Sequence, residues 1–372
     1  MNIETTMTRA WQRQAAWLWL LLPVSWLYGF ITMVRRHAYK IGLFASYRAP
    51  IPLMVIGNIT VGGSGKTPLI IALVNYLQKQ GIKVGVISRG YGGDSNQMPA
   101  LVHADSLPSI VGDEPCLIVN MTGAAMAVCP NRKQAITTLL NAHPDLQLII
   151  ADDGLQHYAL QRDIEWIVVD ASRGFGNQQL LPTGFLREPM SRLTGANVVY
   201  HEKADRTTKD NKQAKAKRLT MHLQADKLQP LWSSAVEIDG LSVAEKMPMP
   251  LIPNGRVHAV SGIGYPQRFF DTLLSLGFDV IGHAYPDHYD FSLTELLQYS
   301  ELPIIVTSKD AVKIRALLID TSSRQPLNDE YQELVNRLWV LPVTAVLSDS
   351  CYVSLQQQLK ALNINLSKST KA

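Results

Sequence analysis

Short apolar runs alternate with amphipathic stretches along most of the 372-residue chain. The runs are rich in Val, Ile and Ala, a composition typical of strands that are buried on both faces. The stretches between them carry apolar residues at helical spacing. This alternation predicts an α/β fold, a parallel sheet flanked by helices. The first half of the chain predicts strands at 52–56, 84–88, 125–128, 146–151, 166–169 and 197–200, and helices at 68–80 and 131–141.

A second α/β pattern begins near Val257. It predicts strands at 257–260, 280–281, 303–307 and 339–346, and a helix at 267–276. Between the two patterns, residues 202–218 are polar and lysine-rich without apolar periodicity. This composition indicates a solvated excursion or linker, and a basic patch that touches lipid phosphates is the other interpretation. The expected organisation is a core domain at 41–220 and a smaller α/β lobe at 221–372.

An uncharged and largely apolar run covers residues 15–34. A helix of this length spans about 30 Å, the thickness of the hydrocarbon core of a bilayer. Tryptophan favours the membrane interface, and four of the seven tryptophans lie in or beside this run: Trp11, Trp17, Trp19 and Trp26. We therefore expect residues 1–40 to anchor the protein to a membrane, by spanning the bilayer or by lying in its surface. A buried core helix and a cleaved signal peptide are the alternatives.

Charge and cysteine content indicate where the protein is located and which ligands it can bind. Basic residues are denser after the apolar run than before it, so the positive-inside rule places the main body in the cytoplasm. The net charge of +4 is too small to indicate nucleic-acid binding, but it suits anionic substrates or an anionic membrane face. The three cysteines are widely spaced, which predicts reduced thiols and no zinc site.

A glycine-rich loop follows the first predicted strand, where residues 57–68 read GNITVGGSGKTP. The glycines let successive backbone N–H groups point at phosphate oxygens. Lys66 can reach the β- and γ-phosphates, and the Thr67 hydroxyl can ligate Mg²⁺. Thr60 stands where the strict phosphate-loop pattern has a glycine, but the GGSGKT core is intact. The loop predicts binding of a nucleoside triphosphate by Thr60, Val61, Gly62, Gly63, Ser64, Gly65, Lys66 and Thr67.

Two pairs of adjacent carboxylates stand at the ends of predicted elements. Asp152 and Asp153 follow an apolar strand, where a carboxylate beside a phosphate loop holds the nucleotide's Mg²⁺ directly or through water. We favour Asp152 as the main contact, and a plain Asp-Gly turn is the alternative. Asp113 and Glu114 precede a predicted helix. An aspartate there can act as the base for an attacking hydroxyl, or the pair can cap the helix.

Further polar residues lie in loops that follow other predicted strands. Arg89 is placed for an anionic group or is a solvated arginine in a glycine loop. Arg187 and Glu188 fit an acceptor-binding loop or a structural salt bridge. His288 lies in the sequence HAYPDHY and can serve acid–base chemistry, although adjacent histidines in a loop are more often surface residues. Lys309 follows a strand and can face a phosphate.

Taken together, these segments resemble the tetraacyldisaccharide 4′-kinase family, the lipid A 4′-kinases of Gram-negative bacteria. The resemblance rests on the N-terminal anchor, the phosphate loop with threonine at its first position, and the motifs SRGY, GDEP, DDGLQH, LPTGFLREP, PDHY and SKDAVK. It implies transfer of the γ-phosphoryl group of ATP to the 4′-hydroxyl of a tetraacyldisaccharide 1-phosphate at the bacterial inner membrane. It also implies a P-loop NTPase core and a second, smaller α/β lobe that closes over the nucleotide.

The resemblance implies roles for the matching residues. Asp113 is expected to be the catalytic base on the sugar hydroxyl, with His288 paired to it. Lys66 is expected to hold the phosphates and to stabilise charge in the transition state. The expected metal site comprises Thr67, Asp152 and Asp153. The nucleotide and acceptor sites are expected to include Ser64, Arg89, Tyr91, Glu114, Asp153, Arg187 and Glu188.

Three functions from other classes are compatible with parts of this sequence. A membrane-associated regulatory P-loop ATPase would bind ATP tightly and need no lipid acceptor, but many such switches carry a lysine where this chain has Val61. A nucleotide-driven metallochaperone would need a Cys/His cluster, which the sequence lacks. A soluble kinase of another metabolite would leave the tryptophan-rich N-terminal run unexplained.

Overall fold

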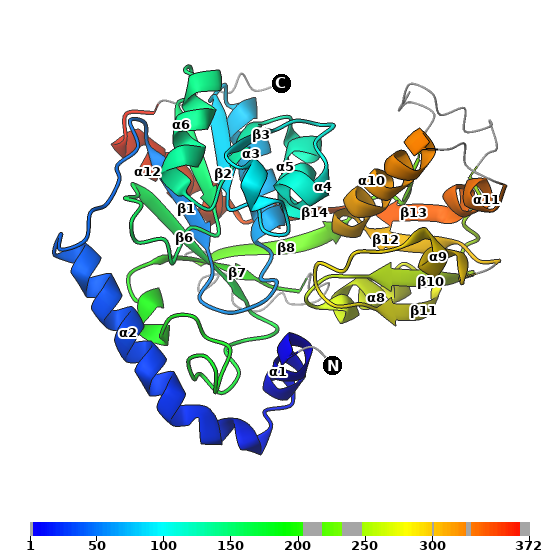
Figure 1. The fold of residues 1–372 in the computed structure, drawn as a ribbon, viewed down its shortest axis with the longest axis horizontal. Coiled ribbons are helices and arrows are strands. Elements are labelled where there is room, and N and C mark those ends of the chain that lie inside the picture. The colour runs from blue at the N-terminus through cyan, green and yellow to red at the C-terminus, as the bar shows by residue number, and fades with distance from the viewer. Residues whose placement is uncertain (1–2, 204–217, 233–247, 300, 325–328, 365–372) are drawn as a thin grey trace.

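The computed structural model of the protein describes residues 3–203, 218–232, 248–299, 301–324 and 329–364. The predicted linker at 202–218 therefore lies almost wholly outside the described residues. The described chain forms two sheets in two lobes that lie side by side (Figure 1). A helical N-terminal segment extends from the larger lobe.

The larger lobe is built on a nine-stranded sheet in the order β14-β8-β7-β6-β1-β5-β2-β4-β3. Its strands are β1 (Leu53–Gly57), β2 (Val84–Ser88), β3 (Ala100–Val102), β4 (Ala125–Val128), β5 (Leu148–Asp152), β6 (Ile164–Asp170), β7 (Asn197–His201), β8 (Leu219–Ala225) and β14 (Val343–Leu347). All neighbouring strands are parallel except the pairs β3·β4 and β8·β14. The predicted α/β fold with a parallel sheet is thus confirmed, and the two antiparallel pairs lie at the edges of the sheet.

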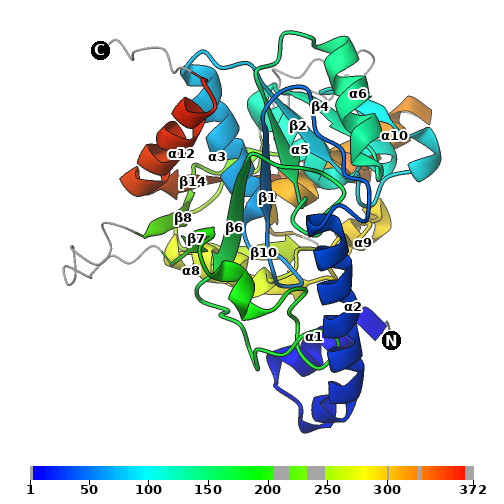
Figure 2. The ribbon, with the colours of Figure 1, turned by 90° about the vertical axis from the view of Figure 1, so that its left-hand side faces the viewer.

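Helices cover both faces of this sheet (Figure 2). One face packs against α3 (Lys66–Lys79), α5 (Asp113–Thr122) and α12 (Asp349–Ala361), and the other packs against α6 (Arg132–Ala142). The short α4 (Pro108–Val111) precedes α5. The central strands β1, β2 and β5 are buried along their whole length, which explains their continuous apolar runs. The carboxyl ends of these strands meet at one edge, where ligands bind in such folds.

The smaller lobe is built on a five-stranded sheet in the order β11-β10-β12-β13-β9. Its strands are β9 (Gln229–Pro230), β10 (Arg256–Ser261), β11 (Asp279–Ala284), β12 (Ile304–Thr307) and β13 (Leu338–Leu341). One core contains residues of α9 (Leu293–Leu297), α10 (Ser308–Arg324) and α11 (Asp329–Arg337), and a second core contains residues of α8 (Pro266–Ser275). In this lobe, too, helices pack their apolar side chains against a mainly parallel sheet.

The expected strand at 339–346 is wrong, because two strands of different sheets occupy that region. β13 ends at Leu341 and β14 begins at Val343, with Pro342 between them. Proline has no N–H to continue a ladder, and the residues after it pair with β8 in the larger sheet. Residues 343–361 therefore complete the larger lobe, although the expected domain at 221–372 included them. The domain boundaries themselves stay a prediction.

The N-terminal segment consists of α1 (Ile3–Gln12), a 3₁₀ turn (Ala16–Leu21) and α2 (Leu22–Lys40). Pro23 lies in the first turn of α2, where its missing N–H leaves no hydrogen bond unmade. Among the described residues, Ala16–Lys40 is the one helical segment long and apolar enough to cross a membrane, judged by length and composition. Many of its large apolar side chains are exposed: Trp17, Trp19, Leu20, Val24, Trp26, Leu27, Phe30, Ile31, Met33 and Val34.

The other side of α2 is fixed to the loop at residues 180–187 of the larger lobe. The Ser25 hydroxyl lies 2.8 Å from the Thr183 hydroxyl and donates to the Leu180 carbonyl at 3.0 Å. The Tyr28 hydroxyl donates to the Arg187 carbonyl at 3.0 Å. The helix therefore presents its apolar face to solvent while its polar contacts hold it to the lobe that carries the phosphate loop.

Candidate active site

The phosphate loop joins the carboxyl end of β1 to the start of α3. Gly62 and Gly65 have φ values of +94° and +93°, which favour glycine, and α3 begins at Lys66. The Lys66 Nζ lies 3.2 Å from Asn58 Oδ1 and 3.3 Å from Asp153 Oδ1. Asn58 is fully buried and also donates to the Gly62 carbonyl at 3.2 Å, so it ties the lysine to the loop backbone.

A second loop supports the phosphate loop from the side of α2. The Val61 N–H donates to the Phe185 carbonyl at 2.8 Å, and the Arg187 N–H donates to the Ile59 carbonyl at 2.7 Å. Thr60 forms an isolated antiparallel bridge with Leu186 between these two bonds. The residue that departs from the strict phosphate-loop pattern thus pairs with the predicted LPTGFLREP segment.

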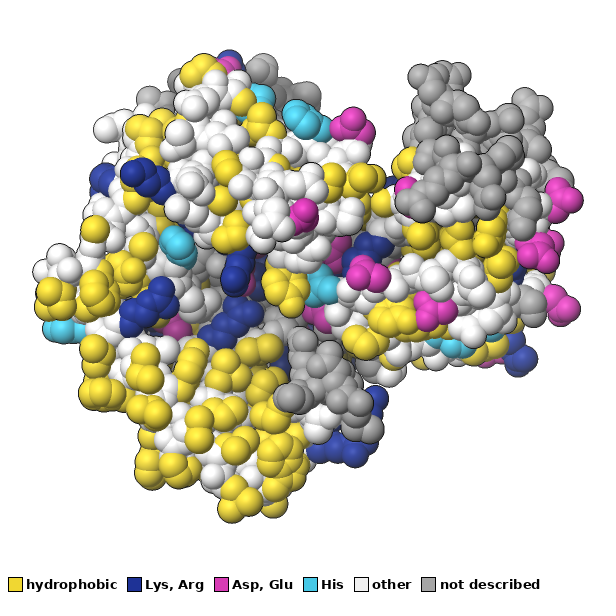
Figure 3. All heavy atoms as spheres, viewed as in Figure 1, with side chains coloured by type: hydrophobic (Ala, Val, Ile, Leu, Met, Phe, Trp, Pro, Cys, Tyr) yellow, Lys and Arg dark blue, Asp and Glu magenta, His cyan; other side chains and the backbone are white. Residues whose placement is uncertain are grey.

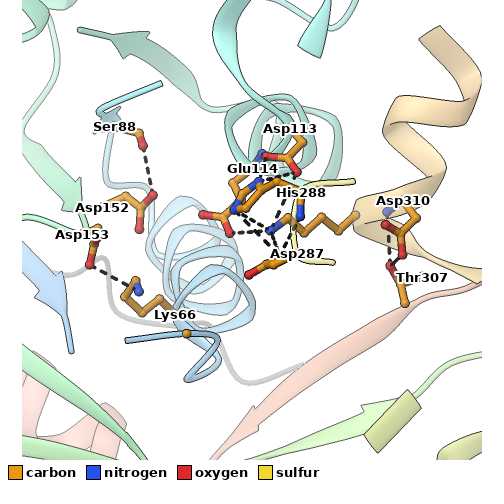
Figure 4. Close-up of polar contacts among 12 residues, drawn as sticks. Lys66, Ser88, Asp113, Glu114, Asp152, Asp153, Asp287, His288, Thr307 and Asp310 are labelled. Carbon is orange, nitrogen blue, oxygen red and sulfur yellow. Dashed lines mark hydrogen bonds and ion pairs between the residues drawn. The ribbon is translucent and has the colours of Figure 1, made fainter. Parts of the chain in front are cut away.

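Asp152 is the last residue of β5 and Asp153 follows it, both beside the phosphate loop (Figure 4). Asp152 is 2% exposed and accepts a hydrogen bond from the Ser88 hydroxyl on Oδ2 at 3.0 Å, while its Oδ1 is buried without a partner. Burial, together with the negative charges of Glu114 and Asp153, raises the pKa of Asp152 well above its usual range.

Asp153 has the opposite electrostatic environment. Its carboxylate pairs with Lys66 and with Arg187, at 3.3 Å and 3.0 Å. Burial acts to raise its pKa, but these two cations outweigh it and hold the pKa of Asp153 well below its usual range. Because its partners already satisfy Asp153, the unpartnered oxygen of Asp152 is the better placed of the two for a cation.

The donor atoms near the phosphate loop suit Mg²⁺, which prefers oxygen ligands. The buried, unpartnered Oδ1 of Asp152 supplies one such atom, and the hydroxyl of Thr67, in the first turn of α3, supplies a candidate second. Two protein oxygens are few, but Mg²⁺ usually completes its shell with water and substrate phosphates. The residues present therefore fit this ion.

A second acidic centre joins the two lobes. Asp113 is the first residue of α5, is 4% exposed and lies opposite His288 of the smaller lobe. The His288 Nδ1 lies 3.1 Å and 3.0 Å from the two carboxylate oxygens of Asp113. His288 has a φ of +59°, an unusual backbone conformation for a residue other than glycine. The loop between β11 and α9 thus holds the ring against a carboxylate 175 positions away in sequence.

Two lysines of α10 complete this centre. Lys309 Nζ donates to Glu114 Oε1 at 3.2 Å and to Asp287 Oδ1 at 3.1 Å, and it lies 3.8 Å from Asp113 Oδ2. Lys313 Nζ lies 3.4 Å from the same oxygen of Asp113. Burial acts to raise the pKa of Asp113, but the His288 hydrogen bond and the lysine charges hold it well below its usual range.

Among the other predicted site residues, Tyr91 contacts the Asp113–His288 centre, whereas Glu188 supports a loop. The Tyr91 ring is 59% exposed and its centroid is 4.8 Å from that of His288, while Arg89 is exposed two residues earlier. Glu188 is 2% exposed and its carboxylate faces Gln156 and Arg192, so it supports the loop from within. The Ser64 side chain is buried.

Sequence reasoning missed several residues of the site. Lys313 was not singled out, and Lys309 was expected to face a phosphate, whereas it is paired with carboxylates in the structure. The signal for both was available in the SKDAVK motif, since residues 309 and 313 lie one helical turn apart on α10. Asn58, which contacts Lys66, carried no comparable signal.

A further contact between the lobes lies on the other side of the phosphate loop. Arg268 of α8 pairs with Asp170 at 2.8 Å, and its Nη1 lies 3.1 Å from His201 Nδ1. The same nitrogen of His201 lies 3.2 Å from the Ser64 carbonyl. The smaller lobe therefore contacts the larger lobe both at the acidic centre and beside the phosphate loop.

Comparisons with known proteins agree with one another. Residues 17–360 match the family described as "Tetraacyldisaccharide-1-P 4'-kinase". A protein named tetraacyldisaccharide 4′-kinase from Psychrobacter arcticus is 73% identical and the match covers 99% of this chain and 98% of the relative. A protein of the same name from Tolumonas auensis is 41% identical, with 94% and 96% covered.

A solved structure shares the fold. It is described as the "apo" form of LpxK from Aquifex aeolicus in complex with ATP, and it matches this chain with a TM-score of 0.65 and 24% identity. The match covers 93% of this chain and 99% of that one. The overall fold is therefore common to both proteins.

Proposed function

The chain belongs to the tetraacyldisaccharide-1-P 4′-kinase family, and we propose that its inter-lobe centre performs the phosphoryl transfer with Asp113 as the base. The reaction moves the γ-phosphoryl group of ATP to the 4′-hydroxyl of the lipid A precursor. The observation that carries the assignment is the contact between the buried Asp113 and the partly buried His288, which come from different lobes and lie at the same sheet edge as the phosphate loop.

Asp113 is suited to accept the proton of the 4′-hydroxyl. Its depressed pKa keeps it ionised, so an oxygen is free of protons at neutral pH. Lys309 Nζ lies 3.2 Å from His288 Nε2 and an ammonium group only donates hydrogen bonds. Nε2 therefore accepts, Nδ1 carries the ring proton, and that N–H donates to Asp113. His288 acts as a positioning residue that orients the carboxylate.

The phosphate loop holds the nucleotide on the other side of the transferring group. The loop's backbone N–H groups and Lys66 bind the phosphates, and Lys66 exchanges its contact with Asp153 for the β- and γ-phosphate oxygens. Thr67 and Asp152 would hold Mg²⁺, which when bound neutralises charge on the phosphate oxygens. The partly exposed Tyr91 and Arg89 face the acceptor sugar, and Arg187 keeps Asp153 in place.

The acceptor is an acylated lipid, so its hydroxyl is presented at a membrane surface. The exposed apolar face of α2 inserts into the bilayer, and the hydrogen bonds of Ser25 and Tyr28 hold the larger lobe beside it. With basic residues after the helix, the catalytic body lies on the cytoplasmic face of the inner membrane. There the enzyme meets its substrate without extracting it from the bilayer.

The alternative function, a regulatory ATPase, would explain the phosphate loop but not the centre formed by Asp113, His288 and the two lysines. A nucleotide switch uses a phosphate loop and a metal site, but it has no need of a second buried carboxylate held ionised by a histidine and two lysines. The family match spans both lobes and includes that centre. A lipid kinase uses both centres together.

Transfer of label from γ-labelled ATP to tetraacyldisaccharide 1-phosphate in mixed detergent micelles tests this proposal. We expect Mg²⁺-dependent label in the lipid with the wild-type protein, and its loss in Asp113→Ala. ATP binding should be retained in that variant, because Asp113 lies outside the phosphate loop. ATP hydrolysis without label in the lipid would refute the kinase assignment, and full transfer by Asp113→Ala would refute the base.

A further inference from the structure

The charges of four arginines from separate elements act on His157, which lies in the loop after β5. Arg132 opens α6, Arg162 precedes β6, Arg89 follows β2 and Arg35 lies in the last two turns of α2. Burial first, and then the positive charges of these four arginines, lower the pKa of His157 to about 4. The arginines therefore give this region a positive potential. His157 is neutral at physiological pH and adds no charge to it.

Two of the four arginines are compensated by the protein. Arg162 pairs with Glu165 at 3.0 Å and donates to the His157 carbonyl at 3.0 Å. Arg132 is buried and donates to the Asp152 carbonyl at 2.9 Å, and the negative charges of Asp152 and Asp153 act on it. Within the described residues, Arg35 and Arg89 have no ion pair with a carboxylate. The charges of Arg35 and Arg89 are therefore available to pair with an anionic ligand.

Arg35 is held in place by aromatic rings. Its guanidinium carbon lies 5.9 Å from the centroid of the Tyr39 ring and 5.8 Å from that of Tyr158. Such cation–π contacts use the face of the guanidinium and leave its edge N–H groups free. The neighbouring Arg36 also acts on Tyr158 through its charge and has no ion pair among the described residues. The edge of a guanidinium matches a phosphate oxygen pair in a bidentate fashion.

The position of these arginines connects the two functional surfaces of the molecule. Arg35 follows the exposed apolar face of α2, while Arg89 is two residues from Tyr91, whose ring contacts His288. Figure 3 shows Lys and Arg side chains gathered along the hollow between the apolar surface of the N-terminal helices and the rest of the body. A molecule that enters from the membrane therefore passes basic side chains before it reaches Asp113.

We propose that Arg35 and Arg36 form a phosphomonoester subsite that receives the 1-phosphate of the acceptor lipid. This inference rests on the proposed function. The acyl chains then lie along α2, the 1-phosphate lies at the membrane end of the hollow, and the distal sugar extends past Arg89 so that its 4′-hydroxyl reaches Asp113. The subsite orients the disaccharide, because it fixes the end that is already phosphorylated away from the base.

The test compares two acceptors, the tetraacyldisaccharide 1-phosphate and the same lipid without its 1-phosphate, in neutral detergent micelles. The proteins are wild type, Arg35→Ala/Arg36→Ala, Arg35→Lys/Arg36→Lys and the control Arg13→Ala. Arg13 is an exposed arginine after α1 that is not among the charges that lower the pKa of His157, so its loss reports general electrostatic attraction to micelles. The readout is the ratio of kcat/KM on the two acceptors.

We expect wild type and Arg13→Ala to prefer the 1-phosphate lipid by about 10–100-fold, the effect of hydrogen bonds to a charged group. In Arg35→Ala/Arg36→Ala this ratio should fall toward 1, chiefly through KM, and the lysine variant should retain part of it. A ratio near 1 for wild type, or an unchanged ratio in the alanine variant, would overturn the subsite. Absence of transfer to both acceptors by wild type would instead refute the proposed function.

A second arm separates the acceptor's phosphate from bulk lipid headgroups. The same assays are repeated in micelles that contain an anionic phospholipid. If the arginines bind the acceptor, the loss of preference is present with and without that lipid. A defect that appears equally on both acceptors and only in the anionic micelles would assign the arginines to membrane headgroups and contradict the proposal.

Discussion

Asp113 and Asp152 are both nearly fully buried at the carboxyl edge of the larger sheet, yet their surroundings shift their pKa values in opposite directions. At Asp113 the cost of burial is outweighed by the His288 hydrogen bond and by two lysines, so its pKa lies well below the usual range. These partners all come from the smaller lobe. The ionised state of Asp113 therefore depends on contact between the lobes.

At Asp152 no comparable set of cations offsets burial. Ser88 donates to one oxygen, the other has no hydrogen-bond partner, and nearby carboxylates add to the effect of burial in raising the pKa. Cations keep the Asp113 carboxylate ionised, which is the form that can accept a hydrogen bond and then the proton from the attacking hydroxyl, although they lower its proton affinity. A carboxylate that lacks such partners is completed by a bound cation. The comparison thus assigns proton transfer to Asp113 and metal binding to Asp152.

The largest expected effect comes from Asp113→Asn. The amide cannot accept the proton, so we expect kcat to fall by about 10²–10⁴-fold while the Kd for ATP stays unchanged. Single-turnover transfer and equilibrium ATP binding measure the two quantities. Glu114→Gln is the matched control, because Glu114 also contacts Lys309 but not the attacking hydroxyl, and its loss should be smaller. Equal losses in both variants would contradict the assignment.

The next effect is expected from Asp152→Asn. Removal of the charged oxygen should raise the Mg²⁺ concentration for half-maximal transfer by roughly 10–100-fold, with activity recovering as Mg²⁺ is added. Ser88→Ala removes the hydrogen bond to the other carboxylate oxygen and serves as the control, with a smaller expected shift. A Mg²⁺ dependence identical to that of wild type would show that Asp152 is not the metal carboxylate.

A change in pH dependence is expected from Lys313→Met. The substitution removes a positive charge 3.4 Å from Asp113 Oδ2, so the pKa of Asp113 should rise. Because the base works only when ionised, the acidic limb of the kcat/KM profile should move to higher pH. Lys79→Met, at the exposed end of α3, is the control. A limb that stays in place, or moves to lower pH, would break the link between the lysine and the base.

The smallest effect on the reaction is expected from Ser25→Ala, far from both aspartates. Ser25 is 2% exposed and contacts Thr183 and the Leu180 carbonyl. Its loss should lower the free energy of unfolding by about 1–3 kcal/mol, since buried partners are left unpaired. The control is Thr32→Ala, because the Thr32 hydroxyl donates to the Tyr28 and Gly29 carbonyls of the same helix. This variant should lower the free energy of unfolding by a smaller amount. Denaturant unfolding measures both, and equal stabilities would contradict the docking of α2.

Much of the fold followed from local sequence pattern. The strands at Val84–Ser88 and Ala125–Val128 have the predicted bounds, because each is a short run that is buried except at Ala125. The pattern could not separate β13 from β14, since both are apolar and only their partners differ. Partner choice between two sheets is a tertiary property that the alternation of apolar residues does not encode.

Some residues of the site could likewise be predicted from local sequence, and others could not. The phosphate loop could be recognised from twelve contiguous residues, because the chemistry of phosphate binding is carried by local backbone geometry. The pairing of Asp113 with His288 was implied by family resemblance and not by spacing. Lys313 was missed because its role depends on the orientation of α10 toward α5. The roles of residues that come from two lobes depend on how the lobes pack together, which local sequence pattern does not reveal.

The opposite ionisation of the two aspartates is tested most directly by an infrared pH titration of protonated carboxyl groups in the metal-free protein. Wild type is compared with Asp152→Asn and Asp113→Asn. Burial also raises the pKa of Asp310, so the quantity compared is the loss of intensity relative to wild type. We predict a protonated-carboxyl band that persists toward neutral pH, that loses the intensity of one carboxyl in Asp152→Asn and that keeps its intensity in Asp113→Asn. A band that is unchanged in Asp152→Asn but loses intensity in Asp113→Asn would contradict the division of roles between them.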